Sequence, residues 1–283
     1  MPAAKFAWPP KTPDRTATAR ERTSAAVPSQ PAPANLRRPS VFRSIERTWL
    51  GLTTPPLTER IAAAGWVPSL PHEYCPRCGH NIGPHESDDT GCSRCRSRRF
   101  PWERLIRLGE FSGLLREVIH EVKFTRWRRL GHDLGLLLGA ALNRAIDDAE
   151  LPRDHCVLVP VPCSFRRRIA RGIDHTLVLS RGVAAATGLP IVRALSRSHR
   201  PTQLSLPASQ RAENIAGSMR PRRGVDLAGR FVIVLDDVTT TRATLLGACR
   251  TVEKGCKSAP EGRNRRPDGL WAAVAAVTPP PSR

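Results

Sequence analysis

The sequence has no apolar run long enough to cross a membrane. A spanning helix needs about 20 consecutive apolar residues, and the most apolar stretches, such as 231–235 and 270–277, are far shorter. The amino-terminal residues also lack the apolar core of a secretory signal. We therefore expect a cytoplasmic protein without a membrane span. Its eight cysteines are then expected to be metal ligands or free thiols rather than disulfides.

Acidic residues are also scarce. Asp and Glu number 25 against 45 Lys and Arg, so the 283-residue chain has a formal net charge of +20. This excess favours phosphate-rich partners, either nucleic acid or a polyphosphorylated substrate. The alternative is a biased amino-acid usage, in which much of the charge is solvated. Composition alone does not separate the two interpretations.

Composition and motifs predict four segments. Residues 1–40 are rich in Pro, Ala, Thr, Ser and Arg, and we expect a disordered tail because they cannot bury enough apolar surface to order. Residues 41–74 are predicted to be a short helical lead-in, and 75–100 a zinc ribbon. Residues 101–283 are predicted to form the main α/β domain.

Four cysteines carry the ribbon prediction. Cys75 and Cys78 form one Cys-x-x-Cys knuckle, and Cys92 and Cys95 form a second one 13 residues further on. Each knuckle can direct two thiolates at one tetrahedral ion, and this spacing is typical of a Cys₄ zinc site. Redox-active dithiols are the competing interpretation. Because four protein ligands close the coordination sphere, the zinc is expected to be structural.

The stretch 231–244 has the pattern of a strand, an acidic pair and a hydroxyl-rich turn. Phe231 to Leu235 predict a strand buried on both faces, and Asp236 and Asp237 are expected where it leaves the sheet. The carboxylates can hold sugar hydroxyls or Mg²⁺, and the start of the next helix suits a phosphate. We therefore predict a phosphosugar site rather than an ordinary strand with a Thr cap. The hydroxyl residues of the turn are Thr239, Thr240, Thr241 and Thr244.

The remaining apolar patterns predict a doubly wound α/β domain. Lys123–Arg129, where basic residues alternate with aromatics, is interpreted as a connection with Phe124 and Trp127 packed inward, and a nucleic-acid contact is the alternative. The last apolar run is expected to be an edge or closing strand, with a helix as the alternative. The predicted helices are 111–122, 130–146, 174–187 and 244–254, and the predicted strands are 157–161, 191–195, 231–235 and 270–277.

A cluster of arginines follows the strand at 157–161. Guanidinium groups offer several fixed donors to phosphate oxygens, so this loop is a candidate diphosphate site. A solvated basic loop is the alternative. The arginines are Arg166, Arg167, Arg168 and Arg171.

The acidic motif resembles the phosphoribosyl-diphosphate (PRPP) signature of type I phosphoribosyltransferases, Asp-Asp-Val-x-Thr-Thr-Gly-Ala-Thr. Asp236 and Asp237 match its acids, and Thr240, Thr241, Ala243 and Thr244 match its phosphate loop. Arg242 stands where that family has glycine. An arginine obstructs the close approach and the positive φ that glycine permits, although its guanidinium can itself bind phosphate.

Further motifs extend the resemblance to the ComF family, from about Cys75 to Val277. They are the two cysteine knuckles, Val122-Lys123-Phe124, Pro160-Val161-Pro162, Arg171-Gly172, Thr202-Gln203 and Arg211–Asn214. Where this family usually has Arg-Gly-Phe-Asn-Gln, the chain has Arg171-Gly-Ile-Asp-His175. The resemblance implies a type I phosphoribosyltransferase-like fold, mainly a parallel sheet, behind a zinc ribbon. It also implies a role in competence, with single-stranded DNA and competence or recombination proteins as partners.

Two functions follow. In the first, an enzyme transfers ribosyl 5-phosphate from PRPP: Asp236 and Asp237 hold the ribose hydroxyls, directly or through Mg²⁺, and the arginine loop takes the leaving diphosphate. Residues 239–244, Arg242 and Ala243 included, hold the 5-phosphate. In the second, the same fold is catalytically inactive and binds single-stranded DNA or a nucleotide. Arg242, in the place of the motif glycine, disfavours turnover more than it disfavours anion binding.

Overall fold

A computed structural model describes residues 55–88, 90–124, 128–163, 173–198, 218–257 and 266–280. Apart from Pro55 and Pro56, they belong to one compact unit, Leu57–Arg283. The predicted tail, 1–40, and the arginine loop, 166–171, lie outside the described residues. So do Trp127 and the motifs at 202–203 and 211–214.

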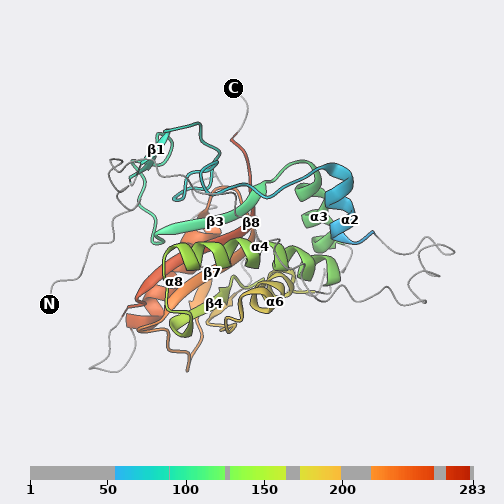
Figure 1. The fold of residues 1–283 in the computed structure, drawn as a ribbon. Coiled ribbons are helices and arrows are strands. Elements are labelled where there is room, and N and C mark those ends of the chain that lie inside the picture. Colours follow the sequence, from blue (N-terminus) through green and yellow to red (C-terminus); the bar gives the residue numbers. More distant parts are fainter. Residues whose placement is uncertain are drawn as a thin grey trace, which may run out of the picture. The chain divides into compact units, whose positions relative to one another are not determined.

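The unit is built on a parallel sheet with the strand order β3-β8-β7-β4 (Figure 1). Its strands are β3, Arg104–Glu110; β4, Cys156–Pro160; β7, Phe231–Thr239; and β8, Gly269–Val277. Every pairing in this sheet is parallel. The predicted mixed α/β class with a parallel sheet is therefore confirmed.

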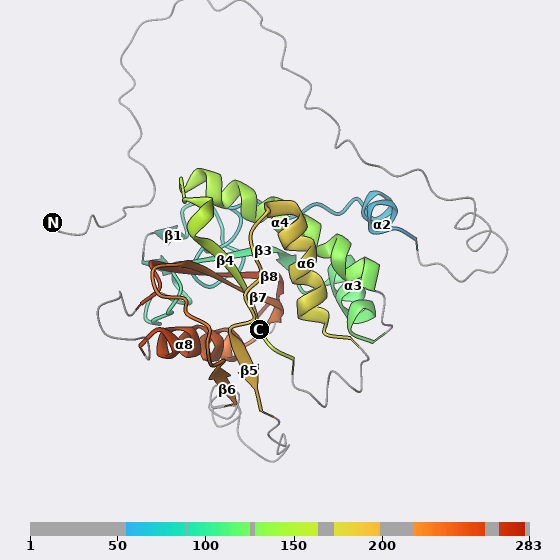
Figure 2. The same ribbon diagram turned by 90° about the horizontal axis from the view of Figure 1, so that it is seen from below.

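Helices cover both faces of the sheet (Figure 2). One face carries α3, Gly113–Phe124, α4, Arg128–Asp148, and α6, His175–Thr187, whereas α8, Ala243–Lys257, lies on the other. Successive residues of a strand point to opposite faces, so Ile233 joins the first core and Val232 and Val234 join the second. Both faces of β7 are thus buried, as its apolar composition predicted.

Shorter elements complete the unit. Helix α2, Leu57–Ala64, adds Leu57 to the core formed with α3 and α4. A 3₁₀ turn, Arg153–His155, precedes β4. Two antiparallel pairs lie outside the main sheet: β1, Ser87–Asp88, with β2, Gly91–Cys92, and β5, Leu195–Arg197, with β6, Met219–Pro221.

Several sequence predictions about the elements were wrong. Strand β3 was missed, and helix α3 begins at Gly113 rather than 111, because Phe111 ends the β3 connection by donating its amide to Val277. The run 270–277 is an interior strand rather than an edge strand, because β3 pairs with it on one side and β7 on the other. The strand expected at 191–195 is reduced to a bridge between Ile191 and Leu158, and the regular strand begins at Leu195.

The end of α8 was also placed wrongly. The helix continues through Gly255 to Lys257. Gly255 serves packing instead of termination, because a Cβ at this position would lie 3.1 Å from the Cβ of Pro221. Within the described residues, no helix combines the length and the apolar composition that crossing a bilayer requires.

Glycines allow α4 and α6 to touch backbone to backbone. A Cβ on Gly135 would lie 2.1 Å from the Leu179 carbonyl oxygen, and one on Gly182 would lie 2.1 Å from the His132 carbonyl oxygen. Neither carbonyl can move without bending its helix. Small residues on both helices therefore set the distance between α4 and α6.

We expect Gly135→Ala to lower the free energy of unfolding by about 1–3 kcal/mol, because overpacking outweighs the gain in helix propensity. Chemical denaturation would measure the loss. Leu136→Ala, at an exposed position of the same helix, should change stability far less. Equal stability of Gly135→Ala and wild type would contradict this view of the helix contact.

Candidate functional site

The sheet opens at the point where β4 leaves β7. The last β4 pairing is Pro160 with Leu235, whose carbonyl accepts a hydrogen bond from Val161 N at 2.8 Å. On its other side β7 stays paired with β8 as far as Thr239. Asp236 and Asp237 therefore lie inside β7, and the prediction that they follow the end of the strand was wrong. They occupy its half-open part, at the carboxyl end, where ligands bind in open α/β sheets.

A cavity of about 170 Å³ lies against this open edge. Of the residues predicted for the phosphosugar site, it is lined by Asp236, Asp237 and Thr244. The described lining does not include Thr239, Thr240, Thr241 or Ala243, which belong to the same turn. The other lining residues are Lys123, Val161, Pro162, Cys163, His175, Thr176, Arg197 and Val238.

Two basic side chains converge on Asp237. Lys123, near the end of α3, places Nζ 2.8 Å from Asp237 Oδ2, and His175, the first residue of α6, places Nε2 3.3 Å from the same oxygen. All three side chains are largely buried, with 19%, 9% and 15% of Lys123, His175 and Asp237 exposed. Asp237 thus connects three separate elements of the fold.

The sequence analysis missed Lys123 and His175 as site residues. Lys123 was assigned to a connection with inward-packed aromatics, but Phe124 is 60% exposed and contacts the His120 ring instead. The ring centroids are 4.8 Å apart. Two signals were available: Lys123 lies in the Val122-Lys123-Phe124 motif, and His175 ends the Arg-Gly-x-x-x motif. Neither motif indicates that Lys123 and His175 share Asp237 as a partner.

The pKa values of the two neighbouring carboxyls are shifted in opposite directions. Burial, followed by the negative charge of Asp237, raises the pKa of Asp236 well above its usual value. Burial also acts to raise the pKa of Asp237, but the Lys123 ammonium and His175 outweigh it and hold this pKa below the usual value. Each carboxylate also accepts a backbone hydrogen bond, from Asp237 N at 2.9 Å and Val238 N at 2.8 Å respectively. The pair therefore offers one carboxyl that binds a proton more readily than usual and one that ionises more readily than usual.

The turn after β7 keeps the shape that its motif requires. Arg242, in the place of the motif glycine, adopts φ = 65°, the left-handed conformation that glycine would take. Its carbonyl accepts the hydrogen bond from Leu246 N at 2.8 Å, and α8 begins at Ala243. The expected obstruction of a positive φ is therefore not realised. The amides of the first turn of α8 have no partner within the helix and can meet an anion, although Ala243 N has a long contact with Thr241 Oγ1 at 3.5 Å.

The side chain of Arg242 takes a different direction from the one predicted for phosphate binding. It is 6% exposed, and its Nε donates to the Cys78 carbonyl at 2.9 Å. The guanidinium thus lies against the first cysteine knuckle. Binding of the 5-phosphate by this side chain, as the sequence suggested, would require it to leave that contact.

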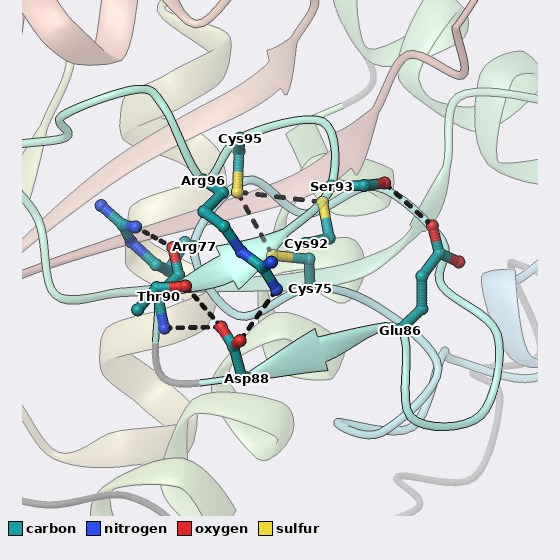
Figure 3. A network of polar contacts seen from close by, with 9 residues as sticks. All are labelled: Cys75, Arg77, Glu86, Asp88, Thr90, Cys92, Ser93, Cys95 and Arg96. Atoms are coloured by element: carbon teal, nitrogen blue, oxygen red, sulfur yellow. Dashed lines mark hydrogen bonds and ion pairs between the residues drawn. The ribbon is translucent and has the colours of Figure 1, made fainter.

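The four predicted cysteine ligands come together. Figure 3 shows three of them, Cys75, Cys92 and Cys95. Their Sγ atoms all lie within 4.8 Å of one another, and the pairs Cys75–Cys95 and Cys78–Cys92 are 3.6 Å apart. Four thiolates around a zinc ion at 2.3 Å would be about 3.8 Å apart, so the cluster can hold such a metal. A hydrogen bond from Cys78 is the largest effect lowering the pKa of Cys75, to about 4.

The first knuckle is packed on the main domain. Leu105 N donates to the Pro76 carbonyl at 2.6 Å, and Trp102 Nε1 donates to the Arg77 carbonyl at 2.9 Å. At Gly79, with φ = 74°, a Cβ would lie 2.7 Å from Leu105 Cδ2. The knuckle therefore rests on β3 and the residues before it.

A second cavity, also of about 170 Å³, adjoins the first. The two share Val161, Pro162, Cys163 and Arg197 in their linings. Arg193 and Arg222 add two further guanidinium groups to the second cavity. The cavity at the acidic pair thus adjoins one lined by three arginines, an arrangement suited to a ligand with a sugar at one end and phosphate at the other.

No protein-family model matches the chain. It is 26% identical to Competence protein F of Haemophilus influenzae over 176 residues, which cover 61% of this chain and 75% of that protein. It is 30% identical to DNA utilization protein YhgH of Salmonella typhi over 178 residues, 60% of this chain and 74% of that protein. The chain belongs to the ComF family.

Solved structures resemble this ComF-family chain only weakly. They include hypoxanthine-guanine phosphoribosyltransferase of Leishmania donovani, with 13% identity and a TM-score of 0.31 over 52% of this chain and 71% of that one. Adenine phosphoribosyltransferase of Leishmania tarentolae has 17% identity and a TM-score of 0.24 over 49% and 70%.

We expect isosteric changes of the two acids to shift stability in opposite directions at pH 7. Asp236→Asn should stabilise the fold by about 1 kcal/mol, because it removes a carboxyl that is costly to ionise. Asp237→Asn should destabilise it by about 1–3 kcal/mol, because Lys123 and His175 lose their partner. Denaturation of both variants would measure the two changes.

The pH dependence follows from the two pKa shifts. The raised pKa of Asp236 costs the wild type stability only above the ordinary carboxyl pKa, so the gain in Asp236→Asn should vanish as the pH falls towards 4. The lowered pKa of Asp237 provides stability above that pH and loses it in acid, so the deficit of Asp237→Asn should also shrink there. Effects of the same sign at neutral pH would contradict the assignment of the two carboxyls.

Proposed function

We propose that this protein binds PRPP or a related phosphosugar in the cavity at the acidic pair and transfers its ribosyl 5-phosphate to a nitrogen acceptor. The observation that carries the proposal is the position of the acidic pair, in the half-open end of β7 and one short turn before α8. An acidic pair suits the hydroxyls of a sugar, and the following helix start suits its phosphate. The acidic motif of the PRPP signature places the same two functions in the same order.

The residues would divide the reaction between them. Asp236 and Asp237 would hold the ribose hydroxyls, and residues 239–244 would hold the 5-phosphate. Mg²⁺, when bound with the ligand, would supply positive charge to the diphosphate. Lys123 forms an ion pair with Asp237. A sugar hydroxyl or a cation that binds this carboxylate would therefore replace part of the contact with Lys123.

The chemical step breaks the bond between C1 of the ribose and the diphosphate oxygen, which keeps the electron pair. The acceptor nitrogen forms the new bond to C1 and loses a proton. Because C1 passes through an oxocarbenium-like state, catalysis would depend mainly on position and charge. Arg166, Arg167, Arg168 and Arg171 would receive the diphosphate. Cys163 and Asp174, close to either end of that loop in the chain, both line the second cavity.

The role of the protein would lie in the use of incoming DNA. One relative is named a DNA utilization protein and another a competence protein. The net charge of +20 suits a polyanionic partner. Single-stranded DNA and competence or recombination proteins would be the partners, and the cytoplasm the location.

A second candidate function is binding without turnover. It is favoured by Arg242, whose buried side chain makes the turn a more constrained structure than a glycine turn. The guanidinium groups of the second cavity would then contact the DNA backbone or a nucleotide phosphate. This form would keep the fold and the zinc ribbon but not the transfer reaction.

The four-cysteine cluster would hold a structural zinc ion. All four thiols are buried and near the tetrahedral spacing, so they would fill the coordination sphere of the ion and leave no open position for a substrate. The metal would stabilise the ribbon without entering the reaction.

Titration with two ligands separates the enzyme from the binding module. We expect PRPP with Mg²⁺ to bind the wild type and to lose about tenfold or more in affinity in Asp236→Asn and Asp237→Asn. Calorimetry would measure binding, and release of diphosphate would report turnover. Asp148→Asn, the same change at an exposed position of α4, is the matched control.

Single-stranded DNA is the second ligand. If PRPP gives neither heat nor a thermal shift while DNA binds equally to wild type and both variants, the enzyme proposal fails. The slope of log affinity against log salt then counts the phosphates contacted.

For the metal, native mass spectrometry should show one zinc ion per chain, lost in Cys75→Ser. Loss of the ion should also lower the melting temperature, because metal binding contributes on the order of 10 kcal/mol to such small modules. Cys249→Ala, which changes a buried cysteine of α8, should keep the ion. A folded wild type that binds no zinc under reducing conditions would contradict the ribbon proposal.

A further inference from the structure

The turn after β7 and the first cysteine knuckle are joined directly. Three consecutive carbonyls of the knuckle, those of Pro76, Arg77 and Cys78, accept hydrogen bonds from Leu105 N, Trp102 Nε1 and Arg242 Nε. The first two donors come from β3 and the residues before it. The third comes from the turn that the phosphosugar proposal assigns to the 5-phosphate.

Arg242 is held in an unusual environment. It is 6% exposed, and Nη2 is buried without a hydrogen-bond partner. Among the described residues, no carboxylate forms an ion pair with it. A cation buried in this way is costly unless an opposite charge lies nearby. Its backbone is also strained, because a non-glycine residue at φ = 65° costs on the order of 1 kcal/mol.

The cysteine cluster supplies the missing negative charge once it holds a metal. Four thiolates around a divalent ion carry a net charge of −2. The Arg242 guanidinium, bonded to the carbonyl of one of these cysteines, is placed to balance part of that charge. Contacts made to the ligand residues, rather than to the ion itself, tune metal affinity in other metal sites.

We propose that Arg242 couples the metal state of the four-cysteine cluster to the phosphate-binding turn. The loaded cluster holds the guanidinium, and the guanidinium holds residue 242 in the left-handed conformation from which α8 begins. Loss of the metal releases the arginine and loosens the turn. Coupling between two binding sites is reciprocal, so an anion in the turn should also slow metal loss. The effect of the anion rests on the proposed phosphosugar site, whereas the effects of the metal on Arg242 and on the turn do not.

Zinc release from the full-length, zinc-loaded protein tests the charge contact. A chromogenic chelator reports the rate for wild type, Arg242→Met and Arg242→Gly. We expect both variants to release zinc roughly 10- to 100-fold faster. Arg96→Met is the matched control, since Arg96 follows Cys95 directly but is 58% exposed and paired with Asp88 (Figure 3). It should stay within about twofold of wild type. Wild-type release rates in both Arg242 variants would overturn the proposal.

Hydrogen exchange of the amides in 239–246 tests the link to the turn without any ligand. Zinc-loaded Arg242→Met should exchange faster there than zinc-loaded wild type, by about tenfold, while the interior strand β8 stays protected in both. Glycine adopts the left-handed conformation without strain, so Arg242→Gly should lose zinc faster yet keep slow exchange in the turn. Equal exchange of 239–246 in wild type and Arg242→Met would show that the arginine does not position the turn.

The third measurement repeats zinc release with PRPP and Mg²⁺. PRPP should slow release several-fold in wild type and Arg96→Met, but not in Arg242→Met. If PRPP binds none of these proteins in the calorimeter, the phosphosugar proposal fails, and the two ligand-free measurements still decide the role of Arg242. If PRPP binds wild type but leaves its zinc release unchanged, the coupling is refuted.

Discussion

The separation of β4 from β7 after Leu235 determines where this molecule can bind a ligand. Up to that residue, β7 has a parallel neighbour on both sides and apolar side chains on both faces. Beyond it, one edge of the strand is open, and the next two residues are acids. A buried acid is tolerated only where a partner or solvent meets it. The open edge supplies both, through Lys123, His175 and the cavity.

The two acids are adjacent in sequence but lie in different environments. Alternation along the strand directs Asp237 towards the face carrying α3 and α6, where two basic groups meet it. Asp236 points to the opposite face, and its pKa is raised by burial and by its neighbour. Two carboxyls with separated proton affinities can serve different purposes, one as a fixed anion and one as a hydrogen-bond donor. This difference is a property of the packing around the strand.

The cysteine module is part of the same structure rather than an appendage to it. Its first knuckle rests on β3 through backbone contacts and touches the turn after β7 through Arg242. An arginine in the place of the motif glycine thus has two roles, one in its backbone and one in its side chain. The strained backbone conformation is maintained because the guanidinium is held at its far end. An arginine at the glycine position of this turn can in this way connect the turn to a second site.

The sequence by itself determined the parts whose signal is local. The two knuckles identified the cysteine cluster, and the apolar runs identified β4, β7 and the helices α4 and α6. In the structure, Asp174 and Gly188 cap the two ends of α6. Strand β3 was not predicted because its two arginines and one glycine interrupt the apolar pattern. Its buried Arg107 donates to Ser69 and Asn81, which lie far from it in the chain.

Only the tertiary structure decided which distant residues act together. Lys123, His175 and Asp237 lie on three elements, and no spacing in the chain relates them. The contact of Arg242 with Cys78 spans 164 residues and runs opposite to the direction that the motif suggested. The physical reason is the same in both cases. Local propensity determines the elements, whereas the pairing of buried charges depends on how those elements pack.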